Sequence, residues 1–577
     1  MSVLTPPTHV GLRDHLVGAA IGTIYLVILL FTANDLAMSR DESFYVIAAH
    51  DYGSWYGQLF SHPERALTQP SIDKHWSFNF EHPALMKTVF GLTWLLDERY
   101  VPAIGKKLGI ADAHLFTTPS LAYRFGGMLS AALLLWLIYV FGARAADRRL
   151  GLFAALSFAT LPRVFYNAHL DCFDVPIVLM ITWVTYCYWR ALLSPRWAIM
   201  TGIAYGCALA TKHNAWLVPA VLVVHFAWVA AQERARRARG EEARVRLTPW
   251  WLLAMLTLGP LIFYASWPYI WFDTFARIGQ YVRFHMKHDY YNMAYMGVNY
   301  FRPPFPISYP FVMTLFTVPL TIVLLMLCGI GLRVRALMPE WLAARLMPRS
   351  ELRADVRATD VLWLGSALVP ILVIALPSTP IFGGTKHWFP SYPFLCLFAG
   401  YAALHVMVST ESRLMSRGLV EAGPVSILSM ALLLAPGFAE TAHSHRFGLS
   451  HYTLAAGGVP GAADWGMNRQ FWGFTTGSVV DFLTQKMPEG GSVWLCDTTY
   501  PAFEMLKKDG RLPENIRAEG HLSEADYVLV HHEHHFAEVD FQAWQAFGSV
   551  QPVNVLTYDG VPIISIYEHP RRKRKTP

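Results

Sequence analysis

The sequence has 577 residues, of which 54% are hydrophobic and 15% charged, and its mean hydropathy is +0.30. So little charge excludes an ordinary soluble protein of this size and indicates a polytopic membrane protein. The net charge of +6 comes mostly from arginines in short connecting segments, so no nucleic-acid partner is expected. The six cysteines show no paired spacing, which argues against a disulfide framework or a zinc knuckle.

Apolar runs that cross about 30 Å of hydrocarbon need roughly 20 residues. The first run, residues 14–34, lacks the charged start and the small-residue cleavage site of a signal peptide, so we expect an uncleaved span. Further apolar runs begin near Leu121, Gly151, Cys172, Trp197, Ala215, Thr248, Ser308, Thr359, Trp388 and Val420. The sequence therefore predicts about eleven transmembrane helices.

The segments between these runs alternate in charge, and every second one is rich in arginine, as in "FGARAADRRLG" and "AQERARRARGEEARVR". Basic connecting segments usually face the cytoplasm. This orientation predicts a multi-pass cell (inner) membrane protein with a cytoplasmic N-terminus. Residues 35–119, 269–307 and 440–577 then lie outside the cytoplasm. The apolar run at residues 83–96 is too short to span the membrane and predicts an interfacial or re-entrant helix.

Residues 440–577 differ in composition from the rest of the chain. The runs "GSVWLCD", "ADYVLVHHEHH" and "VNVLTYDGVPIISIYE" are typical of strands, and "GSVVDFLTQKMP" and "YPAFEMLKKDG" of helices. The motif "VHHEHH" lacks metalloprotease spacing and is interpreted as an exposed polar turn. The predicted fold is mainly α: a membrane domain over residues 1–439, with interfacial helices in its outer loops, followed by a small extracytoplasmic α/β domain over 440–577.

Two clusters of polar residues lie in the first outer segment. Asp41 and Glu42 follow the first span directly, and Glu81, His82 and Lys87 belong to "NFEHPALMK". An acidic pair at the end of a span can serve solubility alone. Several carboxylates beside lipid are costly unless they are solvated or paired, so together they predict a polar cavity.

Further polar clusters fall at the same predicted outer face. Asp171 and Asp174 are three residues apart and can share one helix face. The other clusters contribute His169, Lys212, His213, His285, His288, Lys386 and His387. Carboxylates supply a base and cations supply a site for phosphate. This combination suits transfer of a group from a phosphate-bearing lipid at the outer leaflet.

At these residues the chain resembles the family 39 glycosyltransferases of the GT-C class, which include the protein O-mannosyltransferases and the bacterial aminoarabinose transferase of lipid A. The resemblance runs in order from about residue 14 to 408. It is carried by "RDESFY", "FEHPALMK", the run from "RFGGMLSAALL" to "LSFATLP", "DVP", "ATK", "YFRPPFPISYP" and "KHWFPSYPFLCLFAG". The chain has Ser43 where the aminoarabinose branch has a basic residue, and Ala84 where the family has a second proline.

The resemblance implies a sugar donor on polyprenyl phosphate and an acceptor hydroxyl of a lipid, glycan or protein, with inversion at the anomeric carbon. Asp41 matches the family's catalytic base and Glu42 its motif partner. Glu81 matches a carboxylate that, in the aminoarabinose branch, binds a divalent metal together with a histidine of a later outer loop. In this chain, His285 or His288 could take the place of that histidine. The expected substrate-binding residues are His82, Lys87, Asp174, Lys212, Lys386 and His387.

Two other classes of function are compatible with this composition. A polytopic transporter of a lipid or an anionic solute would more often show internal repeats and charges near mid-membrane. A non-catalytic membrane anchor for residues 440–577 would not require Asp41 or Glu81. The gathering of charged residues at one outer face favours the enzyme.

Overall fold

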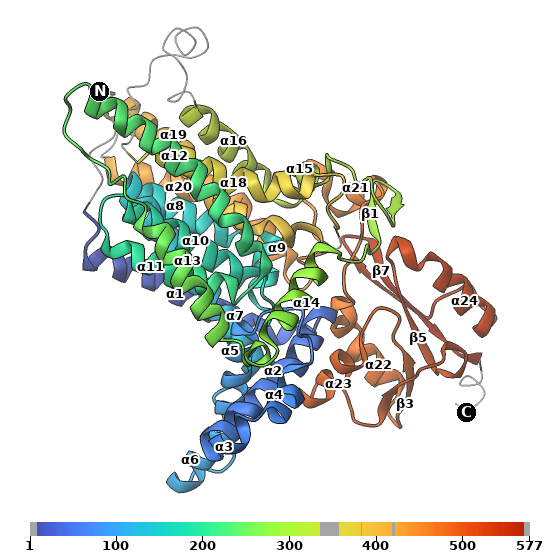
Figure 1. Cartoon of the computed structure of the whole chain (residues 1–577). Helices are drawn as coiled ribbons and strands as arrows, with labels where there is room; N and C mark the ends of the chain where they lie inside the picture. Colours follow the sequence, from blue (N-terminus) through green and yellow to red (C-terminus); the bar gives the residue numbers. More distant parts are fainter. Residues whose placement is uncertain (1–8, 335–356, 382, 418–421, 571–577) are drawn as a thin grey trace.

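The structure is a computed structural model, and it describes residues 9–334, 357–381, 383–417 and 422–570. A helical bundle makes up most of the molecule, and a smaller α/β domain lies at its right-hand end in Figure 1. The start of the described chain lies at the opposite end of the bundle, far from the α/β domain. The expected mainly α fold with a small C-terminal sheet is confirmed.

The first part of the chain supplies one long helix and a group of outer helices: α1 (Leu12–Thr32), α2 (Arg40–Ser61), α3 (Pro63–Ala66), α4 (Gln69–Trp76), α5 (Leu85–Leu95) and α6 (Val101–Leu108). The bundle continues with α7 (Pro119–Ala145), α8 (Arg148–Ala159), α9 (Pro162–Ala168), α10 (Asp174–Ala191), α11 (Arg196–Leu209), α12 (Val218–Ala238) and α13 (Trp250–Ala265). After α14 (Thr274–Met286) and the hairpin β1 (Met293–Tyr295) and β2 (Val298–Tyr300), it closes with α15 (Tyr309–Thr317), α16 (Leu320–Val334), α18 (Thr359–Ala375), α19 (Tyr392–Met415) and α20 (Ala422–Ser444).

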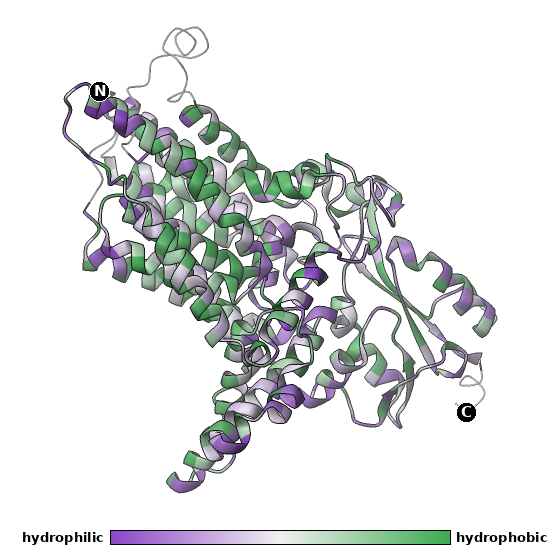
Figure 2. Ribbon diagram, viewed as in Figure 1, coloured by the Kyte–Doolittle hydropathy of each residue, from purple (hydrophilic) through white to green (hydrophobic). Residues whose placement is uncertain are grey.

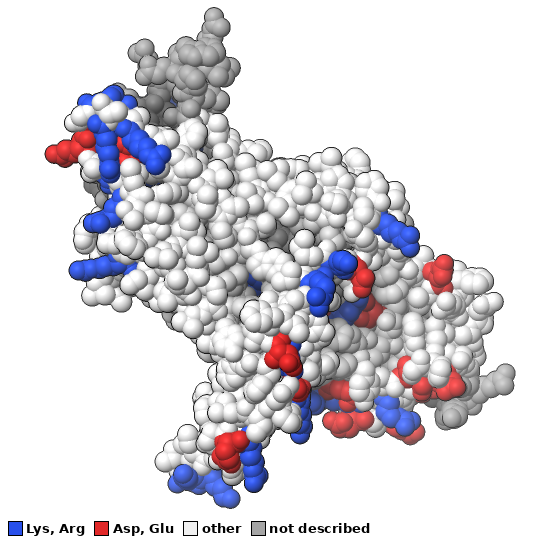
Figure 3. Space-filling model, viewed as in Figure 1, with Lys and Arg blue, Asp and Glu red and all other residues white. Residues whose placement is uncertain are grey.

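Among the described residues, five helical segments are long and apolar enough to cross a membrane, and α13, α16 and α18 are shorter apolar helices. The sides of the bundle are hydrophobic in Figure 2 and nearly free of charge in Figure 3. Lys and Arg gather at the bundle end that carries the N-terminus (Figure 3). An apolar belt with charge at its ends is the surface that a bilayer requires, so the chain is a membrane protein.

Two of the expected spans are interrupted by proline. The apolar run that begins near Ser308 divides into α15 and α16, because Val318, which precedes Pro319, takes an extended conformation. The run around residue 151 likewise divides into α8 and α9 at Leu161, which precedes Pro162. The membrane domain therefore combines long helices with short, broken ones, and the number of eleven spans stays a prediction.

Helices α2 and α5 cross at two glycines. A Cβ atom on Gly53 would lie 2.5 Å from the Gly91 carbonyl oxygen, and one on Gly91 would lie 2.1 Å from the Ala49 carbonyl oxygen. Only glycine permits backbones to approach this closely. The close crossing fixes α2, which begins with Asp41 in its first turn, against α5, the predicted interfacial helix.

The C-terminal domain is built on a five-stranded sheet in the order β4-β3-β5-β7-β6. Its elements are α21 (Gly458–Asp464), α22 (Val480–Lys486), β3 (Gly491–Trp494), α23 (Tyr500–Lys508), β4 (Ile516–Ala518), β5 (Tyr527–His531), α24 (Ala537–Phe547), β6 (Asn554–Tyr558) and β7 (Val561–Glu568). β3 pairs in parallel with β4 and β5, whereas β7 is antiparallel to β5 and β6. The predicted strands and helices of this region are thus confirmed.

The interpretation of "VHHEHH" as an exposed turn is wrong for two of its residues. His531 is fully buried at the end of the central strand β5, where its Nε2 lies 3.0 Å from the Thr476 hydroxyl. Glu533 is also buried. The motif begins inside a covered strand, so the side chains of His531 and Glu533 face the interior.

The C-terminal domain docks on the segment that leads into α2. Arg511 donates a hydrogen bond to the Leu36 carbonyl (3.0 Å), and the Thr499 hydroxyl donates to Ser43 Oγ (2.8 Å). Ala37 packs into the domain's own hydrophobic core. The domain therefore lies directly beside the first turn of α2.

Candidate active site

The first turn of α2 is held by Glu42. Its carboxylate accepts a hydrogen bond from the Ser39 backbone N–H (2.7 Å) and two from Arg124 of α7 (2.8 and 3.1 Å). Arg124 also donates to three carbonyls of the segment that precedes α2, those of Ala33, Leu36 and Ala37. Both side chains of the pair are fully buried. Glu42 thus caps the helix and pairs with Arg124, which leaves its neighbour as the available carboxylate.

Asp41 points from the same turn toward η6 (Gly384–Ser391), the short helix that precedes α19. Its Oδ2 accepts a hydrogen bond from Lys386 Nζ at 2.5 Å. The Asp41 side chain is 26% exposed and that of Lys386 is 7% exposed. Lys386 Nζ also lies 4.0 Å from the centre of the Trp472 ring, a contribution from the C-terminal domain. Asp41 is therefore an accessible carboxylate held by a buried cation.

A second ion pair lies next to the first. Lys212 Nζ donates to Asp174 Oδ1 at 2.6 Å, and both side chains are mostly buried. Asp174 is also within electrostatic range of Lys386. The structure thus brings four predicted residues into an alternating row, Asp41–Lys386–Asp174–Lys212, built from α2, η6, α10 and the end of α11.

Lys87, one of the expected substrate-binding residues, binds backbone groups. Its buried Nζ donates to the backbone carbonyls of Asn79 (2.6 Å) and His82 (2.9 Å). Burial lowers the pKa of Lys87 to about 7. The lysine lies beneath the loop of residues 79–82 and shapes it, so it acts on the site through Glu81 and His82.

His285 of α14 closes the same loop from the other side. Its Nε2–H donates to the Glu81 carbonyl oxygen at 2.8 Å, and its ring lies 4.1 Å from that of His213. Burial lowers the pKa of His285 to about 4 and that of His82 well below its usual value. Both imidazoles are therefore neutral near pH 7 and offer polar edges without charge.

The other three histidines each have contacts of their own. His288 is on the exposed side, with Nδ1 2.8 Å from the Asp289 carbonyl oxygen. His387 Nε2 accepts a hydrogen bond from the Gly383 backbone N–H at 3.0 Å, within its own loop. His169 contacts the Thr32 hydroxyl and the Phe165 carbonyl and packs between helices.

The residues expected to bind a metal do not form a three-ligand group. His285 Nε2 is turned to the backbone of Glu81, not to its carboxylate, which instead accepts from Asn79 Nδ2 (2.8 Å). Among the described residues, the group of three that meets ligand spacing is Asp97, Glu98 and His114. There the Asp97 Oδ1 atom already accepts from the backbone N–H groups of Leu115 and Phe116. Asp97, Glu98 and His114 are thus a possible metal site, and it is distinct from the one expected at Glu81, His285 and His288.

Sequence reasoning missed two aromatic residues of the site. Tyr45 lies one turn after Asp41 on α2. The centre of its ring is 4.1 Å from that of Phe173 and 5.8 Å from that of His82. The carboxylates of Asp41, Asp174 and Glu81 lie within electrostatic range of its hydroxyl. The spacing of four residues from Asp41 would have placed Tyr45 on the same face. Trp472 has no such local signal, because it reaches Lys386 only through the docking of the C-terminal domain.

The structure is similar to those of three larger or equal-sized proteins. ArnT from Cupriavidus metallidurans, determined with undecaprenyl phosphate, has 13% identity and a TM-score of 0.44, with 96% of this chain and 98% of that chain covered. The oligosaccharyltransferase AglB from Archaeoglobus fulgidus, determined with an inhibitory peptide and a dolichol-phosphate, has 12% identity and a TM-score of 0.46, covering 93% and 71%. The arabinofuranosyltransferase AftD from Mycobacteria has 13% identity and a TM-score of 0.41, covering 98% and 40%.

Residues 74–276 match the model of the dolichyl-phosphate-mannose-protein mannosyltransferase family. The matched part includes Glu81, His82, Lys87, Asp174 and Lys212. It begins after Asp41 and ends before Lys386. No curated protein sequence matches the chain. Residues 74–276 of the chain are therefore similar to the dolichyl-phosphate-mannose-protein mannosyltransferase family.

Proposed function

We propose that this protein is a membrane glycosyltransferase that moves a sugar from a polyprenyl-phosphate donor to an acceptor hydroxyl at the outer face of the membrane, with inversion. The family match supports a transferase. The observation that carries the proposal is the accessible Asp41 carboxylate held at 2.5 Å by the buried Lys386, beside the Lys212–Asp174 pair.

Asp41 is the proposed general base. It takes the proton from the acceptor hydroxyl while the hydroxyl oxygen bonds to the anomeric carbon and the bond from that carbon to the phosphate oxygen breaks. Polyprenyl phosphate leaves as an anion and needs no proton, so a single base suffices, unlike the acid and base pair of an inverting glycosidase. Glu42 is buried under this turn and positions it.

Lys386 and Lys212 are the proposed ligands of the phosphate. Each ammonium carries three N–H donors, so each can keep its carboxylate partner and still donate to a phosphate oxygen. As the sugar leaves, negative charge grows on the phosphate, and buried cations stabilise it more than water would. The row of alternating charges then places the base next to the leaving group.

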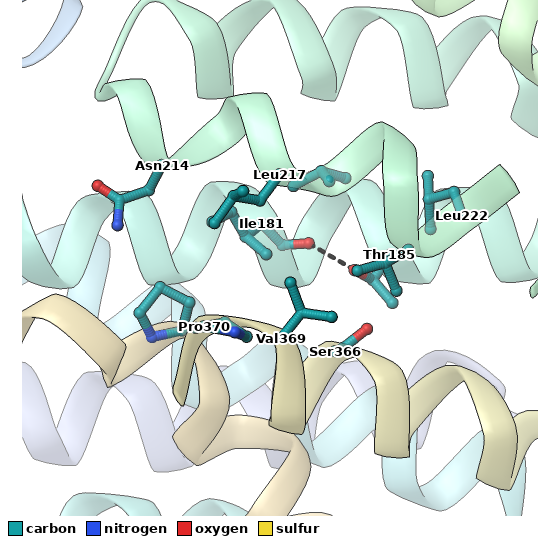
Figure 4. Close-up of a pocket in the computed structure, with 11 residues that line it drawn as sticks. Ile181, Thr185, Asn214, Leu217, Leu222, Ser366, Val369 and Pro370 are labelled. Carbon is teal, nitrogen blue, oxygen red and sulfur yellow. Dashed lines mark hydrogen bonds between the residues drawn. The ribbon is translucent and has the colours of Figure 1, made fainter. Parts of the chain in front are cut away.

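A small apolar groove of about 30 Å³ is the proposed contact for one part of the donor's lipid chain. Between α10, α12 and α18, side chains of Ile181, Leu217, Val369 and Pro370 face a common space (Figure 4). Asn214 lines one end of this space and follows Lys212 by two residues. An isoprenoid chain in the groove would reach the row of charges with its phosphate.

The proposed topology has about eleven spans, a cytoplasmic N-terminus and the C-terminal domain outside, in the inner membrane of the cell. The gathering of Lys and Arg at the N-terminal end of the bundle supports this orientation (Figure 3). The polar row lies toward the other end, where α2 and the C-terminal domain meet. Chemistry at that end would occur at the outer leaflet.

The test uses the purified full-length protein with radiolabelled polyprenyl-phosphate sugars and a membrane extract as the source of acceptors. The wild type should label an acceptor, and Asp41→Asn should label none while it remains folded and inserted. Asp51→Asn, on the same helix, is the matched control and should transfer normally. Full transfer by Asp41→Asn would overturn the assignment of the base. Solute uptake by sealed vesicles, unchanged in Asp41→Asn, would favour the transporter.

A further inference from the structure

Arg40, the residue before Asp41, reaches from α2 into the C-terminal domain. Its guanidinium forms an ion pair with Asp497, and its backbone N–H donates to the Trp472 carbonyl at 3.0 Å. The Arg40 side chain is 37% exposed, whereas that of Asp497 is 2% exposed. The residues on either side of Asp41 are thus both anchored, Glu42 to the bundle and Arg40 to the C-terminal domain.

Asp497 has a second buried carboxyl group beside it. The carboxyl group of Glu533, which follows β5, is buried and lies in hydrogen-bonding contact with that of Asp497. Within the described residues, Asp497 Oδ2 and Glu533 Oε1 have no other hydrogen-bond partner. Two ionised carboxylates cannot satisfy each other, but one shared proton satisfies both.

The charges around Asp497 and Glu533 are consistent with a pair that holds one proton and carries a single negative charge. Burial and the neighbouring Asp497 raise the pKa of Glu533 well above its usual value. The groups beside the pair are Arg40, Asn468, Cys496 and His535, and His531 lies within electrostatic range of Arg40. Burial lowers the pKa of His535 to about 4 and that of His531 to about 3, so both are neutral at pH 7. Arg40 is then the cation that balances the single negative charge of the pair.

We infer that Asp497 and Glu533 are positioning residues: as a pair that shares one proton, they hold the Arg40 guanidinium and so fix the first turn of α2, which carries Asp41. The C-terminal domain then fixes the orientation of the Asp41 carboxylate, in addition to lying beside the site. The effect on catalysis rests on the proposed function, whereas the effect on the first turn of α2 does not.

The decisive substitution is at Glu533. A glutamine at this position donates the same hydrogen bond to Asp497 and is neutral, as the protonated acid is. Glu533→Gln should therefore behave like the wild type, and Glu533→Ala should not. If Glu533 instead worked as an ionised group, Glu533→Gln would be as damaging as Glu533→Ala.

Hydrogen–deuterium exchange of the full-length protein in detergent measures the first turn of α2 directly. Asp497→Asn, Glu533→Ala and Arg40→Gln should each speed exchange of the amides of residues 40–45 by about tenfold, the usual effect of losing one charged hydrogen bond. Glu533→Gln and the control Glu538→Gln, on exposed α24, should leave it unchanged. Exchange in α19 monitors folding in every variant. Unchanged exchange of residues 40–45 in both Asp497→Asn and Arg40→Gln would overturn the inference.

The pH dependence supplies a second readout. After correction for the intrinsic exchange rate, exchange of residues 40–45 in the wild type should rise as alkaline pH removes the shared proton, and Glu533→Gln should show no such rise. In a transfer assay, Asp497→Asn should lower kcat with little change in the donor KM, because the donor ligands are untouched. Asp41→Asn should abolish transfer with normal exchange, so failure of the proposed base and failure of this positioning are distinguishable.

Discussion

Asp41 Oδ2 and Lys386 Nζ lie 2.5 Å apart although 345 residues separate them in the chain. One comes from the start of α2 and the other from the short helix before α19. The contact brings the proposed base and a proposed phosphate ligand together, and it couples the protonation of one to the position of the other.

Substitution of the pair tests this coupling. Asp41→Asn should lower kcat by about 10⁴-fold, the upper end of the usual contribution of a positioned general base, so that labelling is lost in the transfer assay and only sensitive kinetics measures the remainder. Lys386→Met should raise the donor KM and lower kcat as well. Because the two side chains touch, the double variant should lose less activity than the product of the single losses. Steady-state kinetics of the three variants measures this, and strictly multiplicative losses would show that the two residues act independently.

Glu42 should contribute mainly to the stability of the fold, whereas Asp41 should contribute mainly to catalysis. Glu42→Gln breaks a fully buried ion pair with Arg124 and should lower the free energy of unfolding by about 3–5 kcal/mol. Asp41→Asn, at a partly exposed position, should change it by less than about 1 kcal/mol. Denaturation in detergent, followed by tryptophan fluorescence, compares the two. Equal stability of both variants would remove the distinction drawn here between the two acidic neighbours.

His285 should make the protein sensitive to acid. Its pKa is about 4 in the folded state against 6.5 in the unfolded chain, so the unfolded state binds a proton first as the pH falls. Stability should therefore be lost progressively from pH 6.5 to pH 4 and be unaffected by this group above that range. His285→Gln should flatten the loss, whereas substitution of the more exposed His50 should not. Melting temperatures across this pH series give the answer.

The apolar groove should accept the lipid chain of the donor. Val369→Trp would fill the groove and should raise the KM for a long polyprenyl donor by about tenfold or more, the cost of overpacking a closed apolar site. A donor with a short isoprenoid should be affected much less. Leu372→Trp, exposed on the same helix, is the control. If Val369→Trp and Leu372→Trp changed the KM of the long and the short donor equally, the lipid chain would bind outside the groove.

Much of the fold was accessible from local sequence patterns. The C-terminal strands and helices were predicted from β-branched runs and their Pro or Gly ends, and α5 from an apolar run too short for a span. Breaks at Pro162 and Pro319 were missed, because hydropathy over a long window averages across the extended residue that precedes each proline.

The site was only partly accessible. The sequence singled out Lys386 and Lys87, yet it could not pair Lys386 with Asp41, or Lys87 with backbone carbonyls, because such partners depend on the tertiary fold. Arg124 did carry a signal: an arginine inside an apolar run needs a buried acid, and Glu42 was the nearest candidate across the first loop. The sequence around His531 and Glu533 gave no signal that they are buried, because their polar run resembles a surface turn.

The docking of the C-terminal domain on the lead-in to α2 has a consequence for biosynthesis. Leu36 and Ala37 are synthesised before Arg511, which contacts this segment from the C-terminal domain. A nascent chain would therefore insert the membrane bundle before the first turn of α2 has these contacts. Under the proposed function, a product truncated before the C-terminal domain would lie in the bilayer without transferring sugar.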